Sequence, residues 1–397
     1  MIGKGKLTVL GVFVLLLAMA AAIRILWAGG GGPTQPQTRP ADTPRKPSAA
    51  GEFRGVSLQL HNGSEKHPYE KYVDEIAQTG ANTICLVVTG YQENGSSTCI
   101  FLDLRKTPCD GRIKDLIAHA RRRGLRVMVM PIVLLESARA GEWRGKIAPT
   151  SWDGWWADYF EFVLHYAYLA EEGGAEVFVV GSELVSTESQ TDRWRDLIRQ
   201  VRGSFSGRLC YSANWDHYRP IDWWDDLDIL GMTTYYDLTG GDEPTVERLL
   251  ESWEPIKKDI LAWQGKINRP ILFTEVGWPN QETAAQYPWD YYRSQDDPAP
   301  QRQANCFEAF FRTWAGEPAV AGFLVWEWRN SDDQAIGPED TSYVPTGKPA
   351  MQVIRKYYSM PARSIPGSAP LPAPRAGADR TEPSASRNSL EPRAPAE

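Results

Sequence analysis

The sequence predicts an α/β protein built on a (β/α)8 TIM barrel. Across residues 51–360, eight short apolar runs rich in β-branched residues alternate with stretches that have the apolar period of a surface helix. No G-x-G-x-x-G or G-x-x-x-x-G-K-S/T motif follows the early runs, which disfavours a nucleotide-binding open sheet. The composition does not break within this region, and a single barrel needs roughly 250 residues or more. We therefore expect one barrel domain over residues 51–360.

Each predicted strand is a run of apolar residues that ends in polar or aromatic ones. In chain order the runs are FRGVSLQL from Phe53, NTICLVV from Asn82, RVMVMPIV from Arg126, AEVFVVGSEL from Ala175, RLCYSANW from Arg208, LDILGMTTYY from Leu227, PILFTEVGW from Pro270 and VAGFLVWEW from Val320. Between them lie amphipathic stretches such as YEKYVDEIAQTG, GRIKDLIAHARRRG and TDRWRDLIRQVRG. Several of these end in glycine, as helix C-caps do.

The two ends of the chain differ in composition from the barrel region. Residues 1–27 have a basic start and then an uncharged apolar segment, so they are either a signal peptide or an uncleaved membrane anchor. In both cases the remainder is exported, to a periplasmic or extracellular location. Residues 28–50 are predicted to be a flexible linker and residues 361–397 a disordered tail, because neither has apolar periodicity.

Composition limits the class of ligand. The formal net charge is -7, which argues against a nucleic-acid partner, because such a partner requires a basic surface. The chain has 16 Trp, 16 Tyr and 12 Phe, and flat aromatic rings can stack on the C–H faces of sugars as well as fill a core. A neutral ligand fits this composition better than a nucleic acid does.

The five cysteines show no C-x-x-C pair and no histidine at zinc-finger spacing, so we expect no metal site. Cys85 and Cys210 fall in predicted strands and should be buried thiols. Cys99 and Cys109 flank one loop, and a disulfide between them is a hypothesis for an oxidising compartment.

Two acidic residues end predicted strands, which is where barrel enzymes build their active sites. By alternation Glu183 shares a face with Val177 and Val179, and Glu275 shares a face with Phe273. Neither glutamate has a fixed cation beside it in the sequence. A capping or ion-pairing role is the alternative for either one alone. Together they form the paired carboxyl groups that cleave glycosidic bonds.

Three motifs carry a family resemblance: VVGSELVS around Glu183, YSANWD around Asn214, and ILFTEVGWP around Glu275. Over roughly residues 53–358 the sequence resembles clan A glycoside hydrolases, and most closely the β-mannanases of glycoside hydrolase family 113. The resemblance implies a retaining enzyme for β-1,4-mannan. In it Glu183 is the general acid/base and Glu275 is the nucleophile. We expect Glu275 to be ionised and Glu183 to be kept protonated by a drier setting and by the charge of Glu275. We also expect a monomer without a cofactor.

Several other strand-end residues are candidates for binding the sugar. Most clan members have Asn before the acid/base, and here Ser182 stands there, so either its hydroxyl or Asn214 would bind the sugar 2-hydroxyl. Tyr235 is expected to donate a hydrogen bond to Glu275, and Tyr236 would do so if the strand register were shifted by one residue.

Aromatic residues near the last two strands are predicted sugar platforms, with core packing as the alternative. They are Trp326, Trp328 and Trp278, of which Trp326 is favoured because clan members have a Trp at the end of the eighth strand. Glu327 lies between two of these residues, and alternation points it away from Trp326.

Three other residues, His61, Glu136 and Asp216, also end strands and are candidates for outer subsites. Two further functions stay open from sequence: a clan A hydrolase or transglycosylase acting on another β-glycan, and a polysaccharide-binding protein without turnover. The intact glutamate pair argues against the second.

Overall fold

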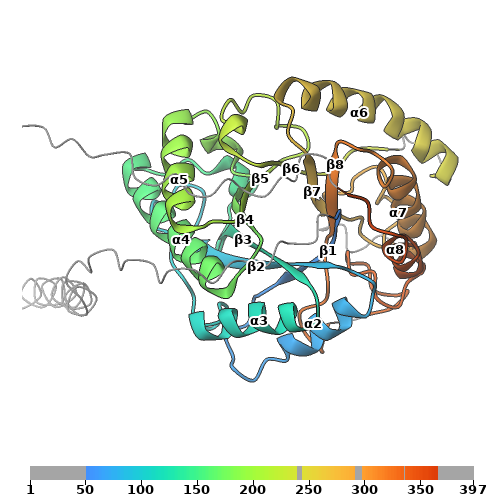
Figure 1. Cartoon of the computed structure of the whole chain (residues 1–397), viewed down its shortest axis with the longest axis horizontal. Helices are drawn as coiled ribbons and strands as arrows, with labels where there is room; N and C mark the ends of the chain where they lie inside the picture. Colours follow the sequence, from blue (N-terminus) through green and yellow to red (C-terminus); the bar gives the residue numbers. More distant parts are fainter. Residues whose placement is uncertain (1–50, 239–243, 291–296, 335, 365–397) are drawn as a thin grey trace, which may run out of the picture. The chain divides into compact units, whose positions relative to one another are not determined.

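The computed structural model describes residues 51–238, 244–290, 297–334 and 336–364, and its eight strands form a closed parallel barrel (Figure 1). Each strand pairs with its neighbours in chain order, and β1 pairs with β8 to close the ring. The predicted (β/α)8 fold is therefore confirmed. The strands are β1 Phe53–Gln59, β2 Thr83–Gln92, β3 Arg126–Leu135, β4 Val177–Ser182, β5 Arg208–Ala213, β6 Ile229–Thr233, β7 Ile271–Val276 and β8 Val320–Val325.

Helices surround the strands as an outer ring (Figure 1). They are α2 Tyr69–Ala77, α3 Asp110–Arg122, α4 Trp152–Gly173, α5 Thr191–Ser204, α6 Val246–Ile267, α7 Pro300–Trp314 and α8 Pro349–Tyr358, with short 3-10 turns η1 Arg144–Lys146, η2 Val185–Thr187 and η3 Trp224–Asp226. In α5 the buried residues are Trp194, Leu197, Ile198 and Val201, which is the i, i+3, i+4, i+7 spacing of a helix with one apolar face.

No helix in the described ranges is long and apolar enough to cross a membrane. The predicted signal or anchor segment, residues 1–27, the linker, residues 28–50, and the tail beyond residue 364 lie outside those ranges.

The strands separate two apolar cores. The inner core fills the barrel with one or more residues from every strand, among them Phe53, Val87, Met130, Val177, Val179, Cys210, Ile229, Leu272 and Leu324. The outer core lies between strands and helices and takes most of the aromatic side chains. Trp194, for example, stacks on Trp223 with ring centroids 4.7 Å apart, and Trp155 stacks on Tyr159 at 4.8 Å. Core packing thus accounts for much of the aromatic excess.

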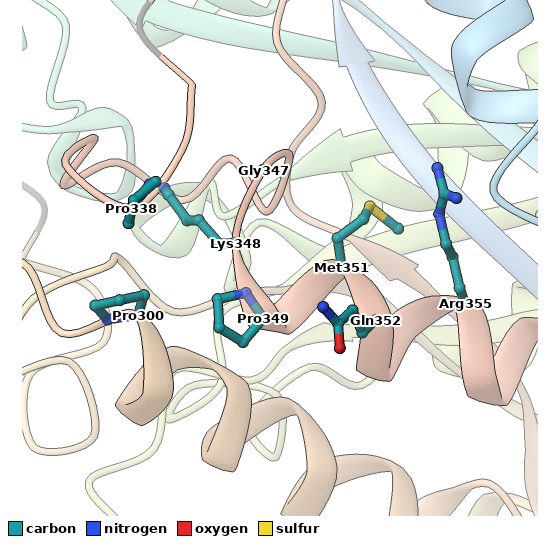
Figure 2. Close-up of a pocket in the computed structure, with 8 residues that line it drawn as sticks. All are labelled: Pro300, Pro338, Gly347, Lys348, Pro349, Met351, Gln352 and Arg355. Atoms are coloured by element: carbon teal, nitrogen blue, oxygen red, sulfur yellow. The ribbon is translucent and has the colours of Figure 1, made fainter.

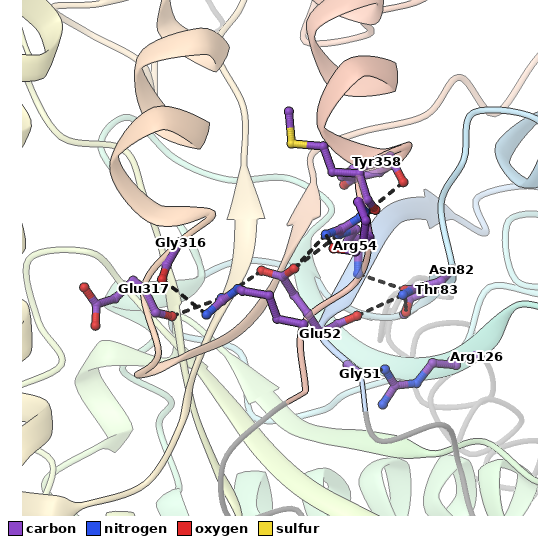
Figure 3. A network of polar contacts seen from close by, with 12 residues as sticks. Gly51, Glu52, Arg54, Asn82, Thr83, Arg126, Gly316, Glu317 and Tyr358 are labelled. Atoms are coloured by element: carbon purple, nitrogen blue, oxygen red, sulfur yellow. Dashed lines mark hydrogen bonds and ion pairs between the residues drawn. The ribbon is translucent and has the colours of Figure 1, made fainter.

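The N-terminal ends of the strands are closed by a polar network (Figure 3). The buried carboxylate of Glu52, just before β1, lies 3.1 Å from the guanidinium of Arg54 and 3.0 Å from that of Arg363. Arg54 also donates to the carbonyl of Pro361, and Gly51 forms an antiparallel bridge with Ser364. The packed region therefore extends to residue 364, beyond the expected start of the tail at 361.

All five cysteines are free thiols, so the hypothesis of a Cys99–Cys109 disulfide finds no support in the structure. Cys85 and Cys210 are buried as predicted, with Cys306 buried as well.

Candidate active site

Strand β4 contains one extra residue immediately before Glu183. Val179 pairs with Cys210, but Ser182 pairs with Ser212, so three steps along β4 match two along β5. Beyond this bulge Glu183 has a left-handed backbone conformation, with φ at 53°. Such a conformation is costly for a residue other than glycine and is found where a side chain must be re-aimed.

Strand β7 has the same irregularity before Glu275. Phe273 pairs with Phe323, whereas Val276 pairs with Val325, which again leaves one extra residue. Phe273 packs outward against the aromatic rings of Phe310 and Trp314. The sequence argument that Glu275 and Phe273 share an inward face is therefore wrong. Glu275 reaches the barrel mouth because the bulge changes the alternation.

Arg144, in the segment between β3 and α4, contacts both glutamates. Its Nη2 lies 2.6 Å from Glu183 Oε2 and 3.7 Å from Glu275 Oε1. No cation stands beside either glutamate in the sequence, but the loop after β3 brings Arg144 across the barrel mouth to both of them. The two carboxyl groups, 6% and 2% exposed, therefore share one guanidinium in a site largely closed to water.

Glu275 accepts the hydrogen bond that was expected from Tyr235. The Tyr235 hydroxyl donates to Glu275 Oε2 over 2.7 Å, while Glu275 Oε1 accepts no hydrogen bond from the described residues. Burial, and then the charge of Glu183, raise the pKa of Glu275 to about 8, against the opposing effects of Arg144 and Tyr235. One oxygen of Glu275 is thus fixed, and the other faces Arg144.

The raised pKa of Glu275 is contrary to the expectation that this residue is ionised at neutral pH. The guanidinium of Arg144 opposes that rise, but it lies closer to Glu183 than to Glu275. The site without substrate therefore favours the protonated form of Glu275.

Glu183 is held by its neighbours on β5 and β6. Its backbone N–H donates to the carbonyl of Ser212 over 2.8 Å, and its Oε1 accepts from the Thr233 hydroxyl over 3.2 Å. The next N–H, that of Leu184, donates to the hydroxyl of Tyr211, which in turn donates to the buried carboxylate of Glu188. These bonds fix both the side chain and the backbone at the bulge.

The three predicted tryptophan platforms divide into one at the mouth and two in the core. Trp326 is half-buried and packs on the inner core at the end of β8. Trp278 is fully buried against Phe307, and Trp328 is buried and donates to Glu75. The prediction that Trp278 and Trp328 bind sugar is wrong, because their rings face the helix layer.

Glu327, which alternation points away from Trp326, lies near Glu275. It accepts a hydrogen bond from Gln59, the last residue of β1, and its charge contributes to the raised pKa of Glu275. Burial raises the pKa of Glu327 itself to about 7. A third carboxyl group therefore borders the site.

The other predicted binding residues occupy different positions around the mouth. Ser182 is buried, and its hydroxyl has no partner in the described part of the chain. Asn214 is half-buried and donates to Asp216 over 2.6 Å. Tyr236 donates to the carbonyl of Trp215 and does not reach Glu275, so the one-residue shift considered for Tyr235 does not occur.

The remaining strand-end candidates lie in polar contacts of their own. His61 is within 3.1 Å of the Thr89 hydroxyl, and burial together with Lys106 lowers its pKa to about 4. Glu136 forms an ion pair with Lys106, and Asp216 is exposed. Nothing in these contacts assigns His61 or Glu136 to a sugar.

A separate hollow lies beside the N-terminal ends of α7 and α8 (Figure 2). It is lined by Pro300, Pro338, Gly347, Lys348, Pro349, Met351, Gln352 and Arg355. None of the candidate residues lines it. The buried ammonium of Lys348 is bound to Asp340 over 2.9 Å, so it fixes the loop after β8.

Sequence reasoning missed Arg144 and Thr233. Thr233 ends β6 on the same face as Tyr235, so alternation identifies it once Glu183 is known to lie opposite. Arg144 lies in GEWRGK, a loop without periodicity or motif, and no signal in one sequence marks it.

The comparisons with known proteins agree with this geometry. The model of Glycoside Hydrolase Family 113 matches residues 61–348. The structure of the β-mannanase AaManA from Alicyclobacillus acidocaldarius, in complex with ManMIm, is similar with a TM-score of 0.69 at 27% identity, over 78% of this chain and 97% of that one. The structure of a complex of a family 113 β-1,4-mannanase is similar with a TM-score of 0.67 at 26% identity, over 78% of this chain and 99% of that one.

More distant structures share the fold alone. The β-glucuronidase of Ruminococcus gnavus has a TM-score of 0.53 at 12% identity, over 77% of this chain and 50% of its own. No curated protein sequence matches the chain significantly. The family match spans most of the barrel and includes both strand-end glutamates. The chain therefore belongs to glycoside hydrolase family 113 and is a β-mannanase-like glycoside hydrolase.

Proposed function

We propose that this hydrolase cleaves β-1,4-linked mannan with retention of anomeric configuration. The observation that carries the proposal is the contact of one guanidinium nitrogen with both carboxyl groups. Since Arg144 Nη2 lies 2.6 Å from the Glu183 oxygen and 3.7 Å from the Glu275 oxygen, those two oxygens are at most about 6.3 Å apart. Retaining enzymes place their carboxyl groups about 5–5.5 Å apart and inverting enzymes roughly 6.5–9.5 Å. The short separation supports retention.

In the proposed first step Glu275 is the nucleophile. Its Oε1, which accepts no hydrogen bond from the described residues, attacks the anomeric carbon while Tyr235 holds Oε2. Glu183 donates its proton to the glycosidic oxygen as the C–O bond breaks, which gives a covalent glycosyl-enzyme and a free sugar end. In the second step Glu183 takes a proton from water, the water oxygen attacks the same carbon, and Glu275 leaves.

This mechanism requires the proton to be on Glu183 when the substrate is bound. Arg144 can make that change, because it already lies within reach of both carboxyl groups. A sugar entering between them separates the guanidinium from Glu183. If Arg144 then moves toward Glu275, it stabilises the ionised nucleophile and leaves Glu183 to take the proton.

The substrate is inferred from relatives and from the mouth. The family 113 structures at 26–27% identity are described as β-1,4-mannanases. The half-buried ring of Trp326 supplies an apolar face beside the carboxyl pair, as expected for a pyranose in the cleavage position. Export is part of the proposal because polysaccharides lie outside the cell, and the apolar N-terminal segment predicts it. Fractionation of cells that express the full chain should recover it outside the cytoplasm, whereas a cytoplasmic protein would contradict export.

The test is hydrolysis of β-1,4-mannan, glucomannan, xylan and cello-oligosaccharides, with the anomer of the first product read by NMR. We expect mannan to be cut to a β-anomer first. Glu183→Gln and Glu275→Gln should each lose turnover by about a thousandfold or more, since proton transfer alone contributes roughly 10²–10⁴-fold. The matched control is Glu161→Gln, an exposed glutamate on α4, which should keep full activity.

The other outcomes separate the alternatives. Cleavage of a different β-glycan with retention would replace the substrate and keep the mechanism. An α-anomer as first product would remove the nucleophile role of Glu275. Binding of oligosaccharides without turnover in the unmodified protein would favour a polysaccharide-binding function.

A further inference from the structure

Trp289 stands apart from the other tryptophans that the structure describes. It lies between β7 and α7 and is 43% exposed, whereas the others are buried or half-buried. An indole exposed to this extent forgoes part of the free energy that full burial of a large apolar side chain provides. The fold therefore does not explain its position.

Trp289 is held in place by other aromatic rings. It stacks on Trp215, with centroids 5.6 Å apart and ring planes inclined by 20°, and Tyr287 contacts it edge-on at 5.9 Å. Trp215 in turn packs against Tyr236 at 5.0 Å and accepts the Tyr236 hydrogen bond at its carbonyl. One face of the Trp289 indole is thus covered and supported, which leaves the opposite face for the solvent.

The backbone of Trp215 is connected through hydrogen bonds to Glu183, the proposed general acid. The backbone N–H of Trp215 donates to the Thr233 hydroxyl over 3.0 Å, and the same hydroxyl donates to Glu183 over 3.2 Å. Two hydrogen bonds therefore separate the backbone of Trp215 from the carboxyl group. On either side of Trp215 in the sequence, Asn214 and Asp216 provide an amide and a carboxylate suited to sugar hydroxyls.

We propose that Trp289, backed by Trp215, is a second sugar-binding subsite that stacks a pyranose ring of the polysaccharide away from the bond being cut. The argument is that a rigid, flat, exposed apolar face lies beside polar groups at the same barrel mouth. This inference rests on the proposed function for the class of ligand, a β-1,4-linked glycan. It adds that the site is an extended groove, so the enzyme favours long chains.

The first arm of the test compares substrates of different length in the full-length protein. In Trp289→Ala, kcat/KM on β-1,4-mannohexaose should fall about tenfold, which corresponds to about 1.4 kcal/mol for the loss of one aromatic stack. The kcat/KM on the shortest cleaved oligosaccharide should stay within about twofold. Trp289→Phe should retain most of the activity on the hexaose. Tyr168→Ala, which removes an exposed ring on α4, is the control and should change neither rate.

The second arm measures binding without turnover, so that it does not depend on mannan being the substrate. Hexaoses of β-1,4-linked mannose, glucose and xylose are titrated calorimetrically into Glu275→Gln, with and without Trp289→Ala. Weaker binding of a hexaose by the double variant supports the subsite even if mannan is not cut. Equal affinity of the two variants, binding of no hexaose, or an equal loss of kcat/KM at every chain length would overturn it.

Discussion

The two ends of the barrel both bury charged groups, but they treat them differently. At the N-terminal end, Glu52 lies between two guanidinium groups, and Arg126 pairs with Glu176 while covering the ring of Phe53. Opposite charges there lie within 3.1 Å of each other. At the C-terminal end, Glu183 and Glu275 share the guanidinium of Arg144, and a third carboxyl group, that of Glu327, lies near enough to raise the pKa of Glu275.

The comparison shows where this protein is stable and where it is reactive. Matched charges at the N-terminal end tie β1 to the segment after α8, which closes the ring (Figure 3). The mouth instead gathers carboxyl groups beside one guanidinium, holds Glu183 in a left-handed conformation and raises the pKa of Glu275 and Glu327. Barrel enzymes in general keep stability at the first end and chemistry at the second.

The largest expected effect is on stability at the N-terminal end. Glu52→Gln removes the negative charge between Arg54 and Arg363 and should destabilise the barrel by about 3 kcal/mol, because it leaves buried cations uncompensated. Thermal unfolding followed by calorimetry should show a lower midpoint, while kcat at 25 °C stays unchanged. Glu161→Gln on α4 is the control for removing a carboxylate. A loss of kcat without a lower midpoint would break the division between the two ends.

A smaller effect is expected at the mouth from Arg144→Met. Since Arg144 lowers the pKa of Glu275, its removal should raise that pKa further and move the acidic limb of the kcat/KM profile to higher pH. Activity at neutral pH should fall roughly 10–100-fold. Lys146→Met removes an exposed cation from the same 3-10 turn and should leave the profile in place. A reduced rate with an unshifted profile would assign Arg144 a structural role only.

The smallest effect is a pH-dependent gain of stability in Glu275→Gln. The pKa of Glu275 rises from an ordinary 4.5 to about 8 in the folded protein, so folding takes up a proton between these values and the native enzyme loses stability as pH rises through them. Glutamine does not titrate, so the Glu275→Gln variant does not lose stability in this way as the pH rises. The melting temperature of the variant should therefore exceed that of the native enzyme by a few degrees at pH 9 and by less at pH 5. A difference independent of pH would mean that Glu275 is not buried with a raised pKa.

The fold and the identity of the central pair could be predicted because both depend on local pattern. Alternating apolar runs identify the strands; Glu183 directly follows β4, and Glu275 is the last residue but one of β7. The reasoning about faces was correct for Tyr235, because β6 is regular up to Thr233 and alternation continues beyond it. It failed for Glu275 and Phe273, because an extra residue in a strand leaves no mark in a single sequence.

The contacts that determine charge and access could not be predicted. Arg144 reaches the site across a loop whose path depends on tertiary packing, and that contact lowers the pKa of Glu275 against the effect of burial. Whether a tryptophan is buried likewise depends on the helix it meets. Trp278 faces Phe307 of α7, whereas Trp326, one strand away, lies at the mouth.

The extra residues in β4 and β7 also bear on transplanting this chemistry into another scaffold. Because Glu183 and Glu275 each lie beyond an insertion, the direction of each side chain is set by a short local segment and is uncoupled from the stagger of the barrel strands. A graft that copies Glu275 onto a regular strand would turn its side chain toward the surrounding helices, on the face that Phe273 occupies. The transferable unit is the strand end together with its insertion, and shortening it by one residue would separate the two carboxyl groups without altering either glutamate.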